Sequence, residues 1–90
     1  MCEKNVTIIN EAGIHARPAG NFVKMAKQYQ SRIMIRNLTS DSYPVSAKSI
    51  SLVLTLGLTK GTSMAITADG PDDEEAVDVL ASFVEQGCGE

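Results

Sequence analysis

The only histidine of the chain, His15, lies in a segment whose residue types suit the transfer of an anionic group. Residues 13–19 read Gly-Ile-His-Ala-Arg-Pro-Ala. A neutral imidazole is a nucleophile, and the nearby Arg17 carries a permanent positive charge. Pro18 lacks a backbone N–H and fits the first turn of a helix, so the segment predicts a helix that begins at about His15 or Ala16.

The start of a helix is a favourable place for an anion beside this imidazole. The first backbone N–H groups of a helix have no acceptor within it and together carry a positive partial charge. The amides of Ala16 and Arg17 are therefore predicted to form an anion pocket next to His15. The same positive end disfavours the imidazolium, so the ring should stay neutral and nucleophilic, while a phosphoryl group on it would be held by these donors.

Position alone leaves other roles open for His15. A single histidine at a helix boundary is more often a capping or surface residue than a nucleophile. No serine nucleophile lies near it in the sequence, which argues against a hydrolase with His15 as general base. The phosphoryl acceptor and the helix cap are therefore the two interpretations.

Length and composition indicate an ordinary globular protein. The 90 residues suffice for one domain, predicted to span residues 1–90, and 43% of them are hydrophobic. The longest apolar stretch is far shorter than the ~20 residues of a membrane span, and we expect a cytoplasmic protein without membrane insertion. Cys2 and Cys88 lie at opposite ends of the chain and suggest neither a disulfide framework nor a metal site.

Charge is distributed unevenly along the chain. Residues 1–50 carry seven basic and three acidic side chains, whereas residues 51–90 carry one basic and eight acidic side chains, and the net charge is -3. One electropositive face could therefore meet acidic partners or a phosphate group. With eight basic residues, no dense basic stripe and few aromatic residues, nucleic-acid binding is not expected.

Hydrophobic periodicity predicts four strands and three helices. The predicted strands cover residues 2–10, 32–37, 43–45 and 63–68. The helices are expected to begin at about residues 15–16, after Ser49 as N-cap, and after the 69–71 turn. In the last helix the predicted buried stripe consists of Ala76, Val79, Leu80 and Phe83.

The element order β-α-β-β-α-β-α defines the expected fold class. It predicts an α+β open-faced sandwich, in which a four-stranded antiparallel sheet carries three helices on one face. Pro44 lies within the third predicted strand and has no N–H to donate, so this strand is expected at an edge of the sheet.

Two segments of the chain resemble the HPr family, the histidine-containing phosphocarriers of the sugar phosphotransferase system. The first is the segment around His15, continued by Phe-Val-Lys at residues 22–24, and the second runs from Ser-Ala-Lys-Ser-Ile at 46–50 to Leu-Gly-Leu-Thr-Lys-Gly-Thr at 56–62. Two motifs in this order are more specific than either alone. The resemblance spans nearly the whole chain, and the predicted element order is also that of the family.

The resemblance implies a phosphocarrier and not an enzyme. His15 would accept a phosphoryl group through its Nδ1 from Enzyme I, itself charged by phosphoenolpyruvate, and pass it to a histidine of a sugar-specific EIIA component. Arg17 would stand beside the phosphoryl group. No cofactor and no metal is implied for the carrier, which is expected to be a monomer.

The resemblance also gives Ser49 a second role beside helix capping. In many relatives this serine is phosphorylated by an ATP-dependent HPr kinase/phosphorylase, which adds about two negative charges near the docking surface. Capping is the simpler role, and the two roles are compatible.

A docking surface is expected around these two sites. An apolar patch is predicted from Ile50, Leu54 and Leu58, with Lys24 and Lys27 as a basic rim that steers acidic partners. The alternatives are core packing for at least one of the apolar residues and a merely solvated helix face for the lysines.

The chain departs from the family pattern in two places. The stretch between His15 and Ser49 is about three residues longer than expected, with the excess at residues 37–46. Ser51 and Leu52 follow Ile50 where relatives often carry an apolar residue and then glycine or lysine. Kinase recognition and partner choice therefore stay open, as do two rival functions: a regulatory HPr-like protein without sugar transport, and a small-molecule sensor with an apolar pocket.

Overall fold

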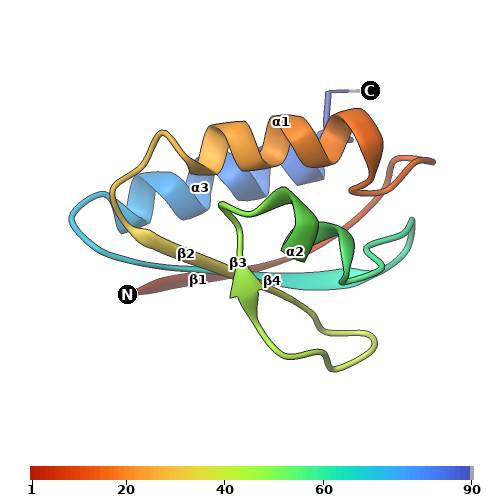
Figure 1. Ribbon diagram of the computed structural model, residues 1–90, viewed down its shortest axis with the longest axis horizontal. Helices are drawn as coiled ribbons and strands as arrows, with labels where there is room; N and C mark the ends of the chain where they lie inside the picture. The colour runs from red at the N-terminus through yellow and green to blue at the C-terminus, as the bar shows by residue number, and fades with distance from the viewer. Residues whose placement is uncertain (90) are drawn as a thin grey trace.

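The computed structural model, which describes residues 1–89, contains the elements in the predicted order (Figure 1). The last residue of the predicted domain, Glu90, lies outside the described residues. No helix within residues 1–89 is long and apolar enough to cross a membrane. The strands are β1 (Cys2–Thr7), β2 (Arg32–Asn37), β3 (Val45–Ser46) and β4 (Ser63–Asp69), and the helices are α1 (Ala16–Ala26), α2 (Ile50–Leu54) and α3 (Asp73–Glu85).

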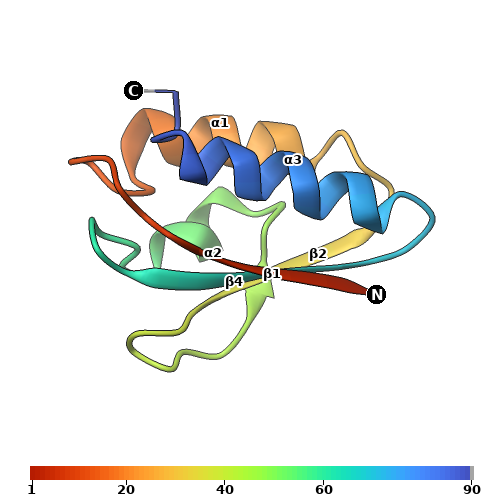
Figure 2. The ribbon, with the colours of Figure 1, turned by 180° about the vertical axis from the view of Figure 1, so that it is seen from behind.

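The four strands form one antiparallel sheet in the order β1-β4-β2-β3. β4 is central and pairs with both β1 and β2, so that Cys2 lies opposite Ala68 and Arg32 opposite Asp69. β3 is at the edge, as Pro44 predicted. Figures 1 and 2 show all three helices on one side of the sheet, with the other face open. The predicted open-faced sandwich is confirmed.

The core lies between the sheet and the helices. Alternate residues of β2 and β4 point toward the helices, as the period-2 pattern predicts. On the helix side, Phe22 is fully buried and its ring centre lies 6.4 Å from that of Phe83. The strand residues of this core are Val6, Ile33, Ile35, Met64, Ile66 and Ala68.

The predicted stripe of α3 is half correct. Ala76 and Leu80 are buried, whereas Val79 and Phe83 are only half-buried. Because α3 packs against both β1 and β4, it buries a broader face than one stripe. The additional buried residues are Val77, Ala81 and Val84.

Three strands differ in their bounds from the prediction, although β4 does so only by ending one residue later, at Asp69. β1 ends at Thr7. The chain nevertheless stays beside residues 61–62, where the Ile8 N–H donates to the Thr62 carbonyl at 2.9 Å. β3 begins only at Val45, and Tyr43, which was expected to lie in this strand, is 90% exposed.

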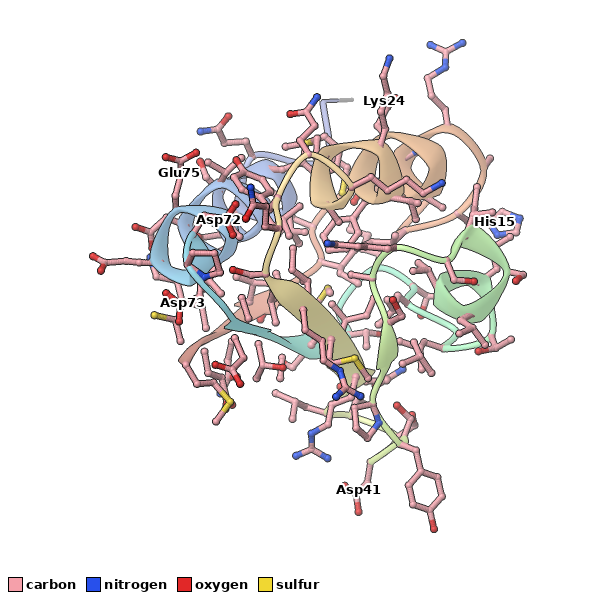
Figure 3. The ribbon with its side chains drawn as sticks, turned by 60° about the vertical axis from the view of Figure 1, so that its left-hand side comes forward. His15, Lys24, Asp41, Asp72, Asp73 and Glu75 are labelled. Atoms are coloured by element: carbon pink, nitrogen blue, oxygen red, sulfur yellow. The ribbon has the colours of Figure 1, made fainter. Side chains whose placement is uncertain are left out.

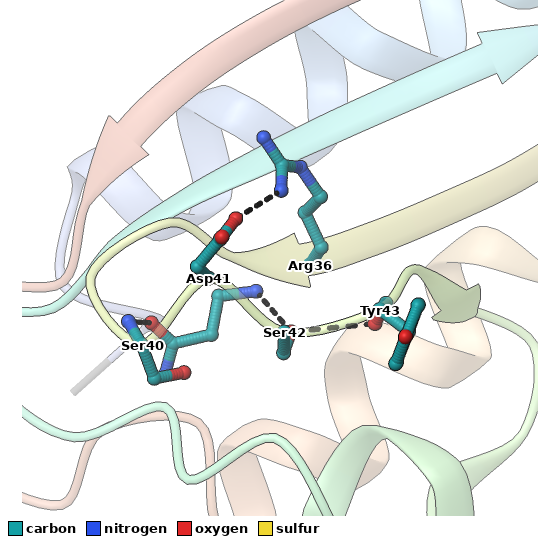
Figure 4. Close-up of polar contacts among 6 residues, drawn as sticks. Arg36, Ser40, Asp41, Ser42 and Tyr43 are labelled. Carbon is teal, nitrogen blue, oxygen red and sulfur yellow. Dashed lines mark hydrogen bonds and ion pairs between the residues drawn. The ribbon is translucent and has the colours of Figure 1, made fainter.

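The hairpin between β2 and β3 is closed by its own polar groups (Figure 4). Arg36 Nη1 donates to Asp41 Oδ1 at 3.0 Å, and the backbone N–H of Asn37 donates to Ser42 Oγ at 2.9 Å. The buried Asn37 side chain donates through Nδ2 to the Leu56 carbonyl at 2.9 Å. The hairpin extends away from α1 (Figure 1), so the extra residues lie apart from the His15 segment.

Asp72 joins the loop between α1 and β2 to the start of α3. Its carboxylate accepts hydrogen bonds from the backbone N–H groups of Gln30 and Ser31, both at 2.9 Å, and from the Ser31 hydroxyl. The Ser31 hydroxyl first, and then the Gln30 amide, hold the pKa of Asp72 below its usual value of 3.8.

These hydrogen bonds predict acid-sensitive stability. A carboxylate whose pKa is lowered by folding stabilises the folded state fully above its unfolded pKa, about 4, and loses that contribution as pH falls through the folded pKa. We therefore expect Asp72→Asn to be less stable than the unchanged chain at neutral pH, with the difference shrinking below about pH 4. Urea midpoints measured across this range check the prediction, with the exposed Glu74→Gln in the same turn as control. A difference that is constant with pH would contradict it.

Candidate functional site

His15 is exposed at the N-terminus of α1, where helix one was predicted to begin. It occupies the N-cap position with an extended backbone, φ -143° and ψ 159°, and no side-chain hydrogen bond caps the helix. Within residues 1–89 the imidazole has no hydrogen bond or ion pair. In Figure 3 the ring projects outward at the end of α1 that lies beside α2. Both ring nitrogens are therefore free to react.

The first turn of α1 contains no acidic residue. Ala16, its first residue, has a φ of +51°, in the left-handed region that costs a non-glycine residue about 1–2 kcal/mol. Arg17 is exposed and has no ion-pair partner within residues 1–89, and Pro18 is buried in the first turn as predicted. The structure thus brings Ala16 and Arg17 to an uncapped helix start beside His15, where an anion is favoured.

The position of His15 is set through the backbone of the loop before it. The N–H of Gly13 donates to the Asn10 carbonyl at 3.1 Å, and Asn10 Nδ2 donates to the Gly13 carbonyl at 2.9 Å. The next N–H, that of Ile14, donates to the Leu58 carbonyl at 2.8 Å. Asn10 was not among the predicted site residues, although Asn at the first and Gly at the fourth position is typical of a type I turn.

An ion pair fixes the outer side of the same loop. Lys60 Nζ lies 2.7 Å from Glu11 Oε1, and Lys60 holds the pKa of this exposed carboxyl below its usual value. The negative charge nearest to His15 in sequence is thereby compensated.

Ser49 is the N-cap of α2, as predicted. Its Oγ accepts a hydrogen bond from the Leu52 N–H at 3.4 Å and lies 3.2 Å from the Oγ of Ser51. Ser49 is half-buried and Ser51 is exposed. The capping role is confirmed, and regulatory phosphorylation stays a prediction.

Two of the three residues of the predicted apolar docking patch are exposed, and their docking role stays a prediction. Ile50 is 46% exposed and Leu54 is 40% exposed, one turn apart on α2. Leu58 is only 3% exposed, so its assignment to the docking patch is wrong. Gly57, with φ +62°, ends the helical path, and Leu58 enters the core. Leu52, which was not predicted for this patch, is also exposed, at 42%. It faces away from Ile50, because two residues of a helix turn the chain by about 200°.

The basic residues of α1 lie on its exposed surface. Lys24 and Lys27 are exposed, and neither forms an ion pair within residues 1–89. Figure 3 shows Lys24 pointing outward from α1. Lys48 Nζ instead donates to the Tyr29 carbonyl at 2.6 Å and ties the segment before α2 to the end of α1. Lys24 thus lies in the last turn of α1 and Lys27 at its C-cap, at the end opposite to His15, while α2 exposes apolar side chains.

The cavities of the molecule lie elsewhere. One of about 390 Å³ lies at the edge of β1 and is lined by residues that include Thr7, Ile9 and Glu85. Another of about 360 Å³ lies between α1 and α3, with Met25 and Phe83 in its wall. Neither is lined by His15, and no cluster of metal-ligating residues occurs within residues 1–89.

Comparisons with known proteins match this arrangement. The family described as PTS HPr component phosphorylation site matches residues 2–86. The phosphocarrier protein HPr of Vibrio cholerae is 45% identical over 86 residues, which cover 96% of this chain and 98% of the relative. The multiphosphoryl transfer protein of Haemophilus influenzae is 42% identical over 84 residues, 93% of this chain but only 17% of that longer protein.

Solved structures agree with the sequence relatives. The crystal structure of HPr-C-His from Thermoanaerobacter tengcongensis has a TM-score of 0.93 and 38% identity, and covers 100% of this chain and 98% of its own. A phosphocarrier protein HPr from Bacillus anthracis has a TM-score of 0.86 and 36% identity over 92% of this chain and 95% of its own. The fold and the order of its elements are therefore shared with these proteins.

Proposed function

This chain belongs to the HPr family of phosphotransferase-system phosphocarriers, and on that premise we propose that His15 is the residue that carries the phosphoryl group. The chain is a carrier and not an enzyme, as the family is. In this proposal His15 accepts the group from phosphorylated Enzyme I and passes it to a sugar-specific EIIA domain. The whole domain, residues 1–90, acts in the cytoplasm as a monomer.

The observation that supports this role most strongly is the exposed, unbonded imidazole at an uncapped helix start. A histidine that merely capped α1 would bond a backbone N–H of the first turn, and His15 does not. The free amides of this turn and the guanidinium of Arg17 stabilise the negative charge of a phosphoryl group on the ring. One place therefore serves both the neutral nucleophile and its anionic product.

The transfer balances without a cofactor. The Nδ1 lone pair of His15 attacks phosphorus, the new N–P bond forms as the bond to the donor breaks, and Nε2 keeps its proton. In the second step the N–P bond at His15 breaks as a histidine nitrogen of EIIA bonds to phosphorus, and the electron pair returns to Nδ1. Such a reaction asks the protein for positioning and charge stabilisation.

Docking brings the partner's reacting group to this exposed ring. Ile50 and Leu54 supply an apolar contact beside His15, and Lys24 and Lys27 attract acidic groups of Enzyme I and EIIA. Because these lysines form no ion pair within residues 1–89, their charge is available to a partner.

Incubation with phosphoenolpyruvate and Enzyme I tests the proposal. We expect the chain to gain the mass of one phosphoryl group, on His15, in an adduct that is labile in acid and stable in base. Addition of an EIIA domain should return the mass to its starting value. An unmodified mass after complete charging of Enzyme I would overturn the proposed function.

Arg17→Glu is expected to slow transfer to and from His15 by tenfold or more, because it replaces a favourable charge beside the phosphoryl group by a repulsive one. Rates of phosphoryl gain from Enzyme I and loss to EIIA, measured by rapid quench, check both directions. Arg32→Glu makes the same charge change at an exposed position on β2 and serves as the control. Equal rates for the two variants would show that net charge, and not Arg17, sets the rate.

Ser49 is proposed as a regulatory site for an HPr kinase/phosphorylase. A phosphate there adds about two negative charges next to the apolar docking residues of α2 and would weaken the docking of acidic partners. With ATP and the kinase we expect an acid-stable phosphate that is absent from Ser49→Ala and retained in Ser51→Ala. Because Ser51 Oγ lies only 3.2 Å from Ser49 Oγ, this matched variant decides which hydroxyl is modified. Label that persists in Ser49→Ala would contradict the assignment.

A further inference from the structure

We infer that Asn10 is a positioning residue for phosphoryl transfer at His15. The inference rests on the proposed function, since it concerns how the phosphoryl acceptor is held. Asn10 lies five residues before His15, and its side-chain hydrogen bond is to Gly13 and not to a docking residue.

Asn10 closes the turn that leads into His15 by two hydrogen bonds in opposite directions. Its backbone carbonyl accepts from the Gly13 N–H at 3.1 Å, and its side-chain Nδ2 donates to the Gly13 carbonyl at 2.9 Å. The side chain is 8% exposed, so water competes little for these groups. The backbone N–H and the backbone carbonyl of Gly13 are thereby both hydrogen-bonded to Asn10.

The other end of the same side chain has no partner. Asn10 Oδ1 is buried and accepts no hydrogen bond from residues 1–89. A buried acceptor without a donor lowers the stability of the folded state, and such groups are rare in native proteins. An apolar side chain here would remove the unpaired Oδ1 but would leave the carbonyl of the buried Gly13 without its donor. The asparagine is explained by what its Nδ2 does to Gly13.

Gly13 is the point at which the turn transmits its geometry to His15. Its φ of +65° directs the chain so that the next N–H, that of Ile14, reaches the Leu58 carbonyl at 2.8 Å. The His15 ring itself is held by no hydrogen bond within residues 1–89. Its position relative to Arg17 therefore depends on the backbone of residues 13–15. Misplacement of a reacting group by about 1 Å can slow a transfer by about a hundredfold.

The test is a comparison of Asn10→Ala with the unchanged chain, as acceptors for phosphorylated Enzyme I. We expect kcat to fall about tenfold. KM should stay within about twofold, because the docking residues on α1 and α2 are unchanged. Stability should also change little, since the variant loses the unpaired Oδ1 but leaves the Gly13 carbonyl unpaired in its place. A shifted His15 ring signal in the NMR spectrum should accompany the change in kcat.

Asn37→Ala is the matched control. Asn37 is also buried and also donates through Nδ2 to a backbone carbonyl, that of Leu56, but it is the last residue of β2. This variant should lose stability and keep its kcat. Asn10→Asp keeps the shape of the side chain but removes the Nδ2 donor, and it should lower kcat as Asn10→Ala does. If the alanine variant fails to fold, this second variant still tests the inference.

Each outcome of this comparison either supports or overturns the role of Asn10. A fall in kcat for the folded Asn10 variants only, with KM and the Asn37 variant unaffected, supports the inference. An unchanged kcat in either folded Asn10 variant, or an equal fall in Asn37→Ala, overturns it while leaving the proposed function intact. Absence of phosphorylation of the unchanged chain overturns the proposed function, and the inference with it.

Discussion

Phosphoryl transfer to the chain is expected to fall at least about a thousandfold when His15 is replaced by Ala, because the substitution removes the only nucleophile at the α1 N-terminus. No other histidine in the sequence can accept the group in its place. Quantitative mass analysis after incubation with phosphoenolpyruvate and Enzyme I measures the effect.

The same variant should fold normally. His15 is exposed and bonds to no other side chain within residues 1–89, so its loss should change the free energy of unfolding by less than about 0.5 kcal/mol. Gln28→Ala, at another exposed position after α1, controls for handling and should be phosphorylated at the normal rate. Acid-labile label on His15→Ala would place the phosphoryl group on a different residue.

Gly13→Ala is expected to cause the largest loss of stability among single substitutions in the site. A Cβ at this position would collide with the Leu58 carbonyl oxygen and lie 2.9 Å from Thr59 Cα, and neither backbone atom can rotate away. The φ of +65° adds about 1–2 kcal/mol for any residue with a Cβ. Together we expect a loss of about 3 kcal/mol in the free energy of unfolding, measured by urea denaturation.

Gly57→Ala separates the two causes. Gly57 has nearly the same φ, +62°, but a Cβ there meets no atom within 4 Å. This variant should lose only the conformational part, about 1–2 kcal/mol. If both variants lost the same amount, the close approach of the His15 loop to residues 58–59 would have no energetic weight.

The elements that follow from local pattern could be predicted from the sequence. β2 was predicted with its observed bounds because Ile33 and Ile35 fall on one face of the strand and Arg32 and Arg36 on the other. The start of α1 followed from Pro18, and the α2 N-cap from Ser49, since both residues act on backbone groups within one turn of the chain. The place of His15 at a helix start was therefore predictable as well.

Features that depend on distant segments could not be predicted. Leu58 continues the spacing of Ile50 and Leu54, and only the turn at Gly57 sends it into the core. The α3 residues Val77 and Ala81 are buried because β1 and β4 lie beneath that helix, which no local pattern reveals.

The hydrogen bonds that fix the loops fall into the same class. Asp72 meets residues more than forty positions earlier in the chain, and Lys48 meets Tyr29 nineteen positions away. Asn10 is a different case, because its partner Gly13 is near in sequence. Its importance comes from the burial of the turn and from the contact with Leu58, both of which are tertiary.

The central place of β4 also governs how the chain can fold as it leaves the ribosome. β1 and β2 are not paired with each other, and each finds its main partner only in β4, which is made last among the strands. A nascent chain that ends before Ser63 thus has a β1 strand with no neighbour to pair with. Since such distant pairings form slowly, the sheet should assemble only after synthesis is nearly complete, and until then its strands are candidates for chaperone binding.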